Sequence, residues 1–156
     1  MPLQEVRKLI ENKLKNDLLY VCTLFEYIGR DTKNHRRDVA AAIGVKQIAR
    51  LLQYADINHC LDMQQVADEI IADSGLVTGS FDSVSECKYK VPSVTSIGKV
   101  YQRLIADVKG EEDWAQTIYN VFDSFLSDEI SNFNGSIFYS NPEYLKYSYH
   151  EKVLLS

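Results

Sequence analysis

The sequence contains few of the residues that interrupt regular secondary structure. Its 156 residues include seven glycines and three prolines. Because glycine and proline are the strongest local signals for turns and loops, their scarcity favours long regular elements, and it favours helix over sheet. The length is enough for one ordinary domain or for two small helical ones.

Cysteines and long apolar segments are also scarce. Cys22, Cys60 and Cys87 are odd in number and scattered, which indicates reduced thiols rather than a disulfide framework. No apolar segment approaches the ~20 residues that a membrane-spanning helix needs. The amino terminus is charged throughout and lacks the features of a secretory signal. We therefore expect a cytoplasmic protein that does not enter the membrane.

An excess of positive charge is absent as well, because the formal net charge is −5. Lysine and arginine contacts to phosphates supply most of the affinity of proteins for nucleic acids. The overall charge therefore argues against a nucleic-acid partner, although a local basic patch could still bind one.

Apolar residues recur every three or four positions from Leu3 to Ile28, which predicts helix with one apolar face. Whether this segment is one helix or two is open, because Asn16 and Asp17 could begin a second one. Gly29 is expected to end it. Asn34 is then a suitable N-cap for a short helix that ends at Ile43, with Gly44 as a left-handed stop.

Helical spacing resumes over 45–55, and a further helix is expected from Asp62, its N-cap, to the Ser74–Gly75 pair. Residues 1–75 therefore predict a helical bundle. Residues 76–92 are rich in serine and glycine and show no helical period. This segment is interpreted as a linker or an irregular crossover that ends at Pro92.

The segment 93–156 predicts a second helical portion. Ser93 caps a helix that extends to Gly110, and an acidic segment ending at Asp113 precedes another helix that extends to Ile130. Asn141 caps a last short helix with Pro142 in its first turn. The predicted fold class is therefore all-α. Whether 1–75 and 93–156 are separate domains or share one core stays open.

One segment, 35–54, partly fits a DNA-binding helix-turn-helix. Ala40, Gly44 and Val45 suit the turn, but the positions that should carry apolar anchors hold Arg50 and Gln53. An ordinary corner of a bundle is therefore the preferred interpretation. A DNA-binding regulator is kept as an alternative, because four cations gather in this segment. The candidate nucleic-acid contacts are Arg36, Arg37, Lys46 and Arg50.

Residue patterns for catalysis or metal binding are missing. His59 and Cys60, with Asp56 and Asp62 nearby, match no zinc-binding spacing. Neither a nucleophile motif nor a glycine-rich phosphate loop is present. We therefore predict no catalytic, cofactor-binding or metal-binding residue and no cofactor. An enzyme with a site assembled between the two halves is a second alternative.

The carboxyl-terminal segment is unusually aromatic. Tyrosine offers a large contact area with a polar tip, which suits protein recognition. The same residues could instead fold back and close the core, and this simpler interpretation is preferred for them. The leading functional hypothesis is a non-enzymatic protein–protein interaction or regulatory module that binds another protein or a second copy of itself. The candidate surface comprises Phe138, Tyr139, Tyr144, Tyr147 and Tyr149.

Overall fold

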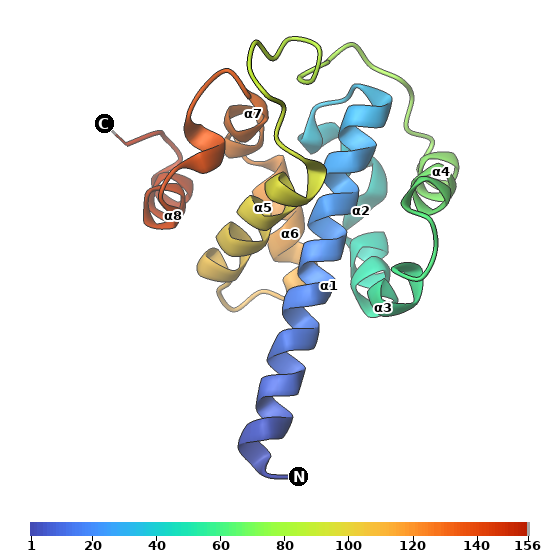
Figure 1. Cartoon of the computed structure of the whole chain (residues 1–156), viewed down its shortest axis with the longest axis vertical. Helices are drawn as coiled ribbons and strands as arrows, with labels where there is room; N and C mark the ends of the chain where they lie inside the picture. The colour runs from blue at the N-terminus through green and yellow to red at the C-terminus, as the bar shows by residue number, and fades with distance from the viewer. Residues whose placement is uncertain (156) are drawn as a thin grey trace.

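The computed structural model describes residues 1–155, and these form eight α-helices, one short 3-10 helix and no strand (Figure 1). The all-α prediction is therefore confirmed. The helices are α1 (Leu3–Thr32), α2 (Arg36–Gln53), α3 (Ala55–Asn58), α4 (Met63–Ser74), α5 (Val94–Val108), α6 (Trp114–Asp123), α7 (Leu126–Ser131), η1 (Ile137–Tyr139) and α8 (Pro142–Glu151).

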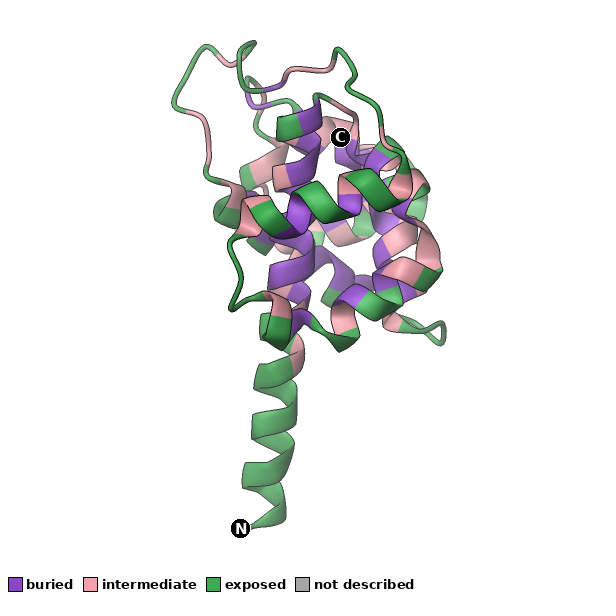
Figure 2. Cartoon of the chain, turned by 90° about the vertical axis from the view of Figure 1, so that its right-hand side faces the viewer, coloured by how far each residue is buried: buried purple, intermediate pink, exposed green. Residues whose placement is uncertain are grey.

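Helices from the two halves of the chain pack against one another. The most extensive packing joins α1 to α5 and α2 to α6, and α8 lies against the outer side of α5. The buried apolar residues form one cluster that draws on both 1–75 and 93–155. Figure 2 shows these buried residues inside the bundle, beneath a more exposed outer surface. The halves therefore share one core.

Helix α1 does not end at Gly29, as the sequence suggested. It continues to Thr32 and ends at Lys33, which adopts a left-handed conformation with φ 56°. A Cβ atom added to Gly29 would lie 2.4 Å from Cδ of Arg36. Gly29 therefore serves a close approach between α1 and the Arg36 side chain, and it does not terminate the helix.

The first part of α1 projects beyond the bundle as an isolated helical arm (Figures 1 and 2). Residues 1–13 are all exposed, and the first fully buried residue of the helix is Leu18. The packed part of the bundle expected over 1–75 therefore begins only near Leu14, because nothing lies opposite the preceding turns. We call residues 3–13 the arm.

Helix α2 bends at Gly44, whose φ of 80° and ψ of 158° interrupt the helix, but helical structure resumes on its other side. Its N-cap position is taken by His35 rather than Asn34. The Asn34 side chain instead donates to the Val77 carbonyl at 2.8 Å. Gly75 ends α4 in a left-handed conformation, as its position predicted.

Side-chain caps define the helices of the second half. Ser93 accepts a hydrogen bond from the Ser96 amide, Asp113 from the Gln116 amide, and Asn141 from the Glu143 amide. The helix expected to extend from Trp114 to Ile130 is broken. Ser124 adopts an extended conformation, and this break separates α6 from α7.

The crossover 76–92 is irregular but is tied to the bundle by hydrogen bonds. The Gly79 amide donates to the Thr32 carbonyl at 2.8 Å, and the Phe81 amide donates to the Lys33 carbonyl at 2.9 Å. Farther along, Asn134 accepts from the Lys88 amide and donates to the Glu86 carbonyl. The first two bonds hold the crossover over the carboxyl end of α1, and the Asn134 bonds hold its later part against the loop after α7.

Candidate functional site

The basic corner at 35–54 is not a surface of four free cations. Arg36 is fully buried, with 0% of its side chain exposed. Its guanidinium donates from Nε to Oε1 of Glu26 at 2.9 Å and from Nη2 to Oε2 at 2.8 Å. Such a bidentate pair is a strong form of hydrogen bonding between charged groups. Arg36 therefore cannot contact a phosphate, and its assignment as a nucleic-acid contact is wrong.

Further partners complete this buried network. Arg36 donates from Nη1 to the Asn34 carbonyl at 2.8 Å, and Arg30 donates from Nε to Glu26 at 2.8 Å and from Nη2 to the Pro92 carbonyl at 2.8 Å. Burial opposes the charge of Arg36, but the hydrogen bonds and charge of Glu26 outweigh it and hold the pKa of Arg36 above its ordinary value. The network is structural, since it joins α1, α2 and the end of the crossover.

The other cations of the corner are also poorly arranged for DNA. Nη2 of Arg37 lies 3.6 Å from Asp128, which partly neutralises it. Lys46 and Arg50 are exposed on α2 beyond the Gly44 bend. Two free cations in a chain of net charge −5 provide little attraction for a polyanion. The corner at 35–54 is therefore a weak candidate.

A polar hollow of about 290 Å³ lies where the crossover meets α7 and the loop that follows it. At its edge, Nδ1 of His35 lies 2.8 Å from Oδ1 of Asp128, and the imidazole stacks on Phe81. A histidine–carboxylate pair becomes catalytic when a nucleophile adjoins the free ring nitrogen. Within residues 1–155, no hydroxyl or thiol forms a hydrogen bond with this ring, so the hollow shows no assembled reactive set. That part of the chain also holds no group of three His, Cys, Asp or Glu side chains suited to a metal ion.

The five aromatic residues proposed as an interaction surface divide into two groups. Phe138, Tyr144 and Tyr149 are half-buried and pack against the core, and the Tyr144 hydroxyl donates to the Leu155 carbonyl at 2.8 Å. Burial raises the pKa of Tyr149 above its ordinary value. Tyr139 and Tyr147 are 69% and 53% exposed. The segment therefore closes the core with one side and presents two tyrosine rings to solvent.

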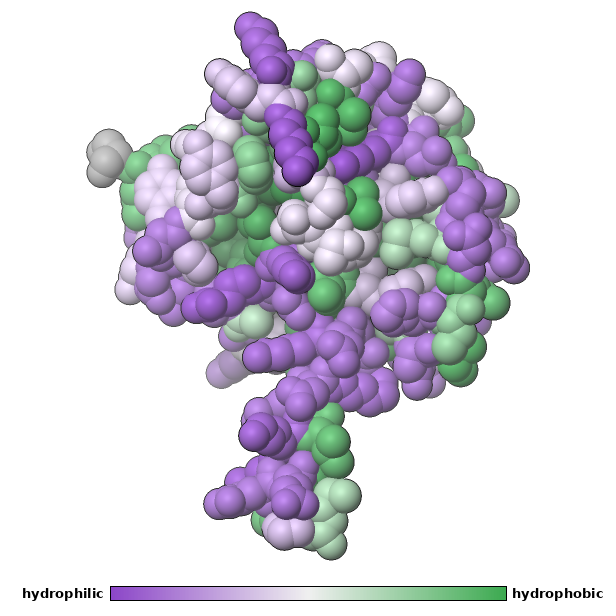
Figure 3. All heavy atoms as spheres, viewed as in Figure 1, coloured by the Kyte–Doolittle hydropathy of each residue, from purple (hydrophilic) through white to green (hydrophobic). Residues whose placement is uncertain are grey.

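Phe138 and Tyr139 also form one wall of an apolar groove of about 550 Å³. Its floor comes from α5 and α8, where Val100, Leu104 and Leu145 lie, and its lower end reaches α1 at Leu18. Figure 3 shows it as an apolar strip left of the centre, with hydrophilic side chains along its lower border. The groove exists because η1 and α8 cross the outer face of α5 without covering it completely.

Cations border the groove on the α1 and α5 sides. Lys15, Lys99 and Arg103 line it, and Arg103 also pairs with Asp107 at 2.9 Å. No carboxylate of residues 1–155 lies within 4.0 Å of the Lys15 or Lys99 ammonium. The groove is therefore apolar at its floor and positive at one rim.

Sequence reasoning identified the aromatic wall of this groove and missed its floor and its rim. Val100 of α5 is only half-buried, and nothing in the sequence showed that α8 would leave it partly open. Lys15 lies 84 residues before Lys99 in the printed sequence, so their proximity depends on the packing of α1 on α5. The Gln102 side chain fixes this packing by donating to the Lys15 carbonyl at 2.7 Å.

Comparison with known proteins adds no relative: no protein family, characterised protein or solved structure matches the chain. None of the helices within residues 1–155 combines the length and the apolar character needed to cross a membrane. The groove between α1, α5, η1 and α8, with its apolar floor and positive rim, is the candidate site.

Proposed function

We propose that this protein is a non-enzymatic binding module whose groove receives the apolar face of an acidic amphipathic helix from another protein. The observation that carries the proposal is the combination of an apolar groove with cations along one rim. An amphipathic helix binds such a groove by placing side chains spaced three or four residues apart on the floor. Acidic residues at the edge of that helix would then face Lys15, Lys99 and Arg103.

The surroundings of the groove also suit a protein ligand. Tyr139 stands 69% exposed at its wall, and tyrosine is enriched in protein interfaces and among the residues that dominate their binding energy. The floor residues Leu104 and Leu145 are buried by the bundle itself, so the groove is preformed and needs little ordering on binding. Rim charges of one sign contribute to partner choice and to association rate.

Binding can be measured by fluorescence anisotropy with two labelled helical peptides, one of leucine and glutamate and one of leucine and lysine in the same pattern. We expect the acidic peptide to bind, with an affinity that falls as salt rises, and the basic peptide to bind at least about tenfold more weakly. Equal affinity for both peptides, or no binding of the acidic one, would contradict the proposal.

A charge-reversal pair locates the site. The variant Lys99→Glu/Arg103→Glu is expected to weaken binding of the acidic peptide at least about tenfold, because two attractive rim charges become repulsive. The matched control Lys46→Glu/Arg50→Glu makes the same charge change on exposed α2 positions that do not line the groove. If both variants weaken binding equally, the peptide senses only net charge, and the groove is not its site.

A further inference from the structure

The arm carries an apolar stripe that nothing else within residues 1–155 covers. Leu3, Val6, Leu9 and Ile10 are 65%, 36%, 56% and 63% exposed. At about 100° per residue, these four side chains fall within an arc of roughly 120°. Figure 3 shows hydrophobic residues along one side of the arm and hydrophilic residues along the other. We call these four residues the arm stripe.

The arm stripe continues the face of α1 that is buried inside the bundle. Leu3 precedes Val21 by 18 residues, and Ile10 precedes Ile28 by the same number, which corresponds to five helical turns. Val21 and Ile28 are both 0% exposed. The arm therefore presents to solvent the same kind of face that α1 elsewhere buries against other helices, and it lacks only the opposing helix.

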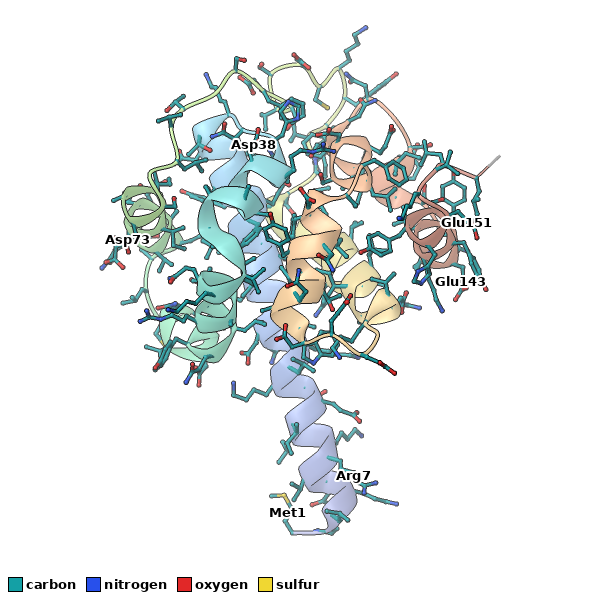
Figure 4. The ribbon with its side chains drawn as sticks, turned by 180° about the vertical axis from the view of Figure 1, so that it is seen from behind. Met1, Arg7, Asp38, Asp73, Glu143 and Glu151 are labelled. Carbon is teal, nitrogen blue, oxygen red and sulfur yellow. The ribbon has the colours of Figure 1, made fainter. Side chains whose placement is uncertain are left out.

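The charge of the arm is opposite to that of the rest of the molecule. Residues 1–13 contain three cations, Arg7, Lys8 and Lys13, and two carboxylates, Glu5 and Glu11, which gives +1. Since the whole chain carries −5, residues 14–156 carry −6. Figure 4 shows Met1 and Arg7 far out on the arm, away from the acidic body. The arm of one copy is thus attracted to the body of another.

A second exposed apolar patch adjoins the base of the arm. Tyr54, Ile57 and Leu61, around α3, are 44%, 61% and 43% exposed. Between α3 and the base of α1 lies a hollow of about 390 Å³. Asp17 and Asp56 both line it. Asp17 pairs with Lys13 of the same chain at 2.7 Å, so the exposed Asp56 supplies the negative charge that a partner can meet. This α3 corner therefore combines exposed apolar side chains with one exposed carboxylate, Asp56, whose charge is opposite to the net charge of the arm.

We propose that two copies of this chain associate through their arms in antiparallel order, with each arm stripe covering the other and each arm tip reaching the α3 corner of the other copy. Residues 3–17 span about 21 Å at 1.5 Å per residue, so an arm that overlaps its partner completely ends at the partner's base, beside α3. A two-fold axis through the arms makes both contacts equivalent.

The antiparallel order follows from charge and shape. Parallel arms would bring two bodies of −6 together at the same end and leave both α3 corners uncovered. Stable interfaces bury about 1,200–2,000 Å² in total, and three turns of paired helix need the additional α3 contact to approach that area. A membrane surface is a poorer occupant, because anionic lipid repels the acidic body behind an arm of only +1. This inference involves a surface distinct from the groove and does not depend on the proposed function.

Sedimentation equilibrium of the full chain over a wide concentration range tests the association. We expect a monomer–dimer equilibrium, and we expect Leu3→Gln/Ile10→Gln to raise the dimer dissociation constant at least about tenfold, because a symmetric dimer loses four buried aliphatic side chains. The control Gln4→Ala/Glu11→Gln alters the opposite face of the arm and should leave the constant within about twofold. Residues 1–13 are exposed, so all variants should keep the native circular-dichroism spectrum. A chain that stays monomeric at every concentration, or that instead floats with anionic vesicles as a monomer, overturns the proposal.

Disulfide trapping tests whether the two arms are antiparallel. Cys60 is exposed beside Leu61 in the α3 corner, whereas Cys22 is buried and cannot interfere. In a Cys87→Ser background, Leu3→Cys should yield a covalent dimer on mild oxidation with diamide. Adding Cys60→Ser should abolish this dimer. Equal trapping with and without Cys60 would mean that the two arm tips meet each other, and the antiparallel arrangement would be wrong.

Discussion

The two ends of α1 belong to one helix but have opposite environments. Near its carboxyl end even a carboxylate, Glu26, is 0% exposed, whereas near its amino end Leu3 and Ile10 are 65% and 63% exposed. The apolar period is the same at both ends. What differs is the set of neighbours: α2, α5 and the crossover surround one end, and no other element of residues 1–155 packs on the other. Burial is therefore decided by neighbours, and hydrophobicity alone does not decide it.

The largest loss of stability at the buried end of α1 is expected when the Arg36–Glu26 ion pair is broken. Arg36→Met should lower the free energy of unfolding by about 3–5 kcal/mol, because it leaves the buried Glu26 carboxylate without its bidentate partner. Urea unfolding measures this loss. The neighbouring Arg37→Met removes a half-exposed ion pair and should cost less than about 1 kcal/mol. Equal losses for the two variants would show that the buried pair contributes nothing special.

A pair of leucine truncations compares the ends directly. Leu24→Ala, at a position that is 0% exposed, should lower the free energy of unfolding by about 2–5 kcal/mol, since it leaves a cavity in the core. Leu9→Ala makes the same chemical change in the arm and should stay within about 0.5 kcal/mol. Urea unfolding at low, fixed protein concentration keeps self-association out of the comparison. A large loss for Leu9→Ala would mean that the arm packs on the bundle in solution.

The close packing of the buried end on α5 can be tested at Gly98. A Cβ atom there would lie 2.2 Å from Oγ1 and 3.1 Å from Cα of Thr23, so Gly98→Ala must push α5 away from α1. We expect a loss of about 1–3 kcal/mol in thermal or urea unfolding. Gly110→Ala is the control, because its Cβ would meet no atom within 4 Å. A neutral Gly98→Ala would show that the two helices can separate without cost.

The smallest effect concerns the crossover above the buried end. Asp82 accepts a hydrogen bond from the Ser85 amide at 3.0 Å, and the bonds from Ser85 hold the pKa of Asp82 below its ordinary value of 3.8. Because the folded pKa is the lower one, this stabilisation is present above about pH 4 and is lost as the pH falls through and below that value. Urea midpoints of the native chain and of Asp82→Ala should therefore differ slightly at pH 6, and the difference should shrink as the pH falls below 3.8. If the difference between the two urea midpoints does not change with pH, the charge of the Asp82 carboxylate is not its cause.

Capping residues and a helix-ending glycine in the sequence correctly predicted several helix boundaries. Ser93, Asn141 and Gly75 occupy the caps expected of them, because a capping side chain or a left-handed glycine acts on its own helix end. Gly29 and Ser124 could not be interpreted in this way. Gly29 leaves room for the side chain of Arg36, which comes from a different helix. Ser124 interrupts a segment whose apolar residues keep helical spacing throughout.

The candidate sites depend on distant neighbours, which spacing does not reveal. Arg36 has the same local context as Arg37, yet only Arg36 meets Glu26 and is buried. The aromatic residues Phe138 and Tyr139 were identified from composition, but the rim of their groove includes Lys15, from the opposite end of the chain. The arm was predicted to be a helix within the bundle, and it is a helix that projects beyond it. The spacing of apolar residues indicates a helix face but does not indicate which element, if any, packs against that face.

The pairing of α1 with α5 has a consequence for synthesis of the chain. The main packing partner of α1 begins at Val94 and ends at Val108, so about 76 further residues must be translated after Thr32 before α5 can cover α1. At ~5–20 residues per second, this interval lasts about 4–15 s. During that time the face of α1 that packs on α5, which includes Thr23 opposite Gly98, lacks its partner.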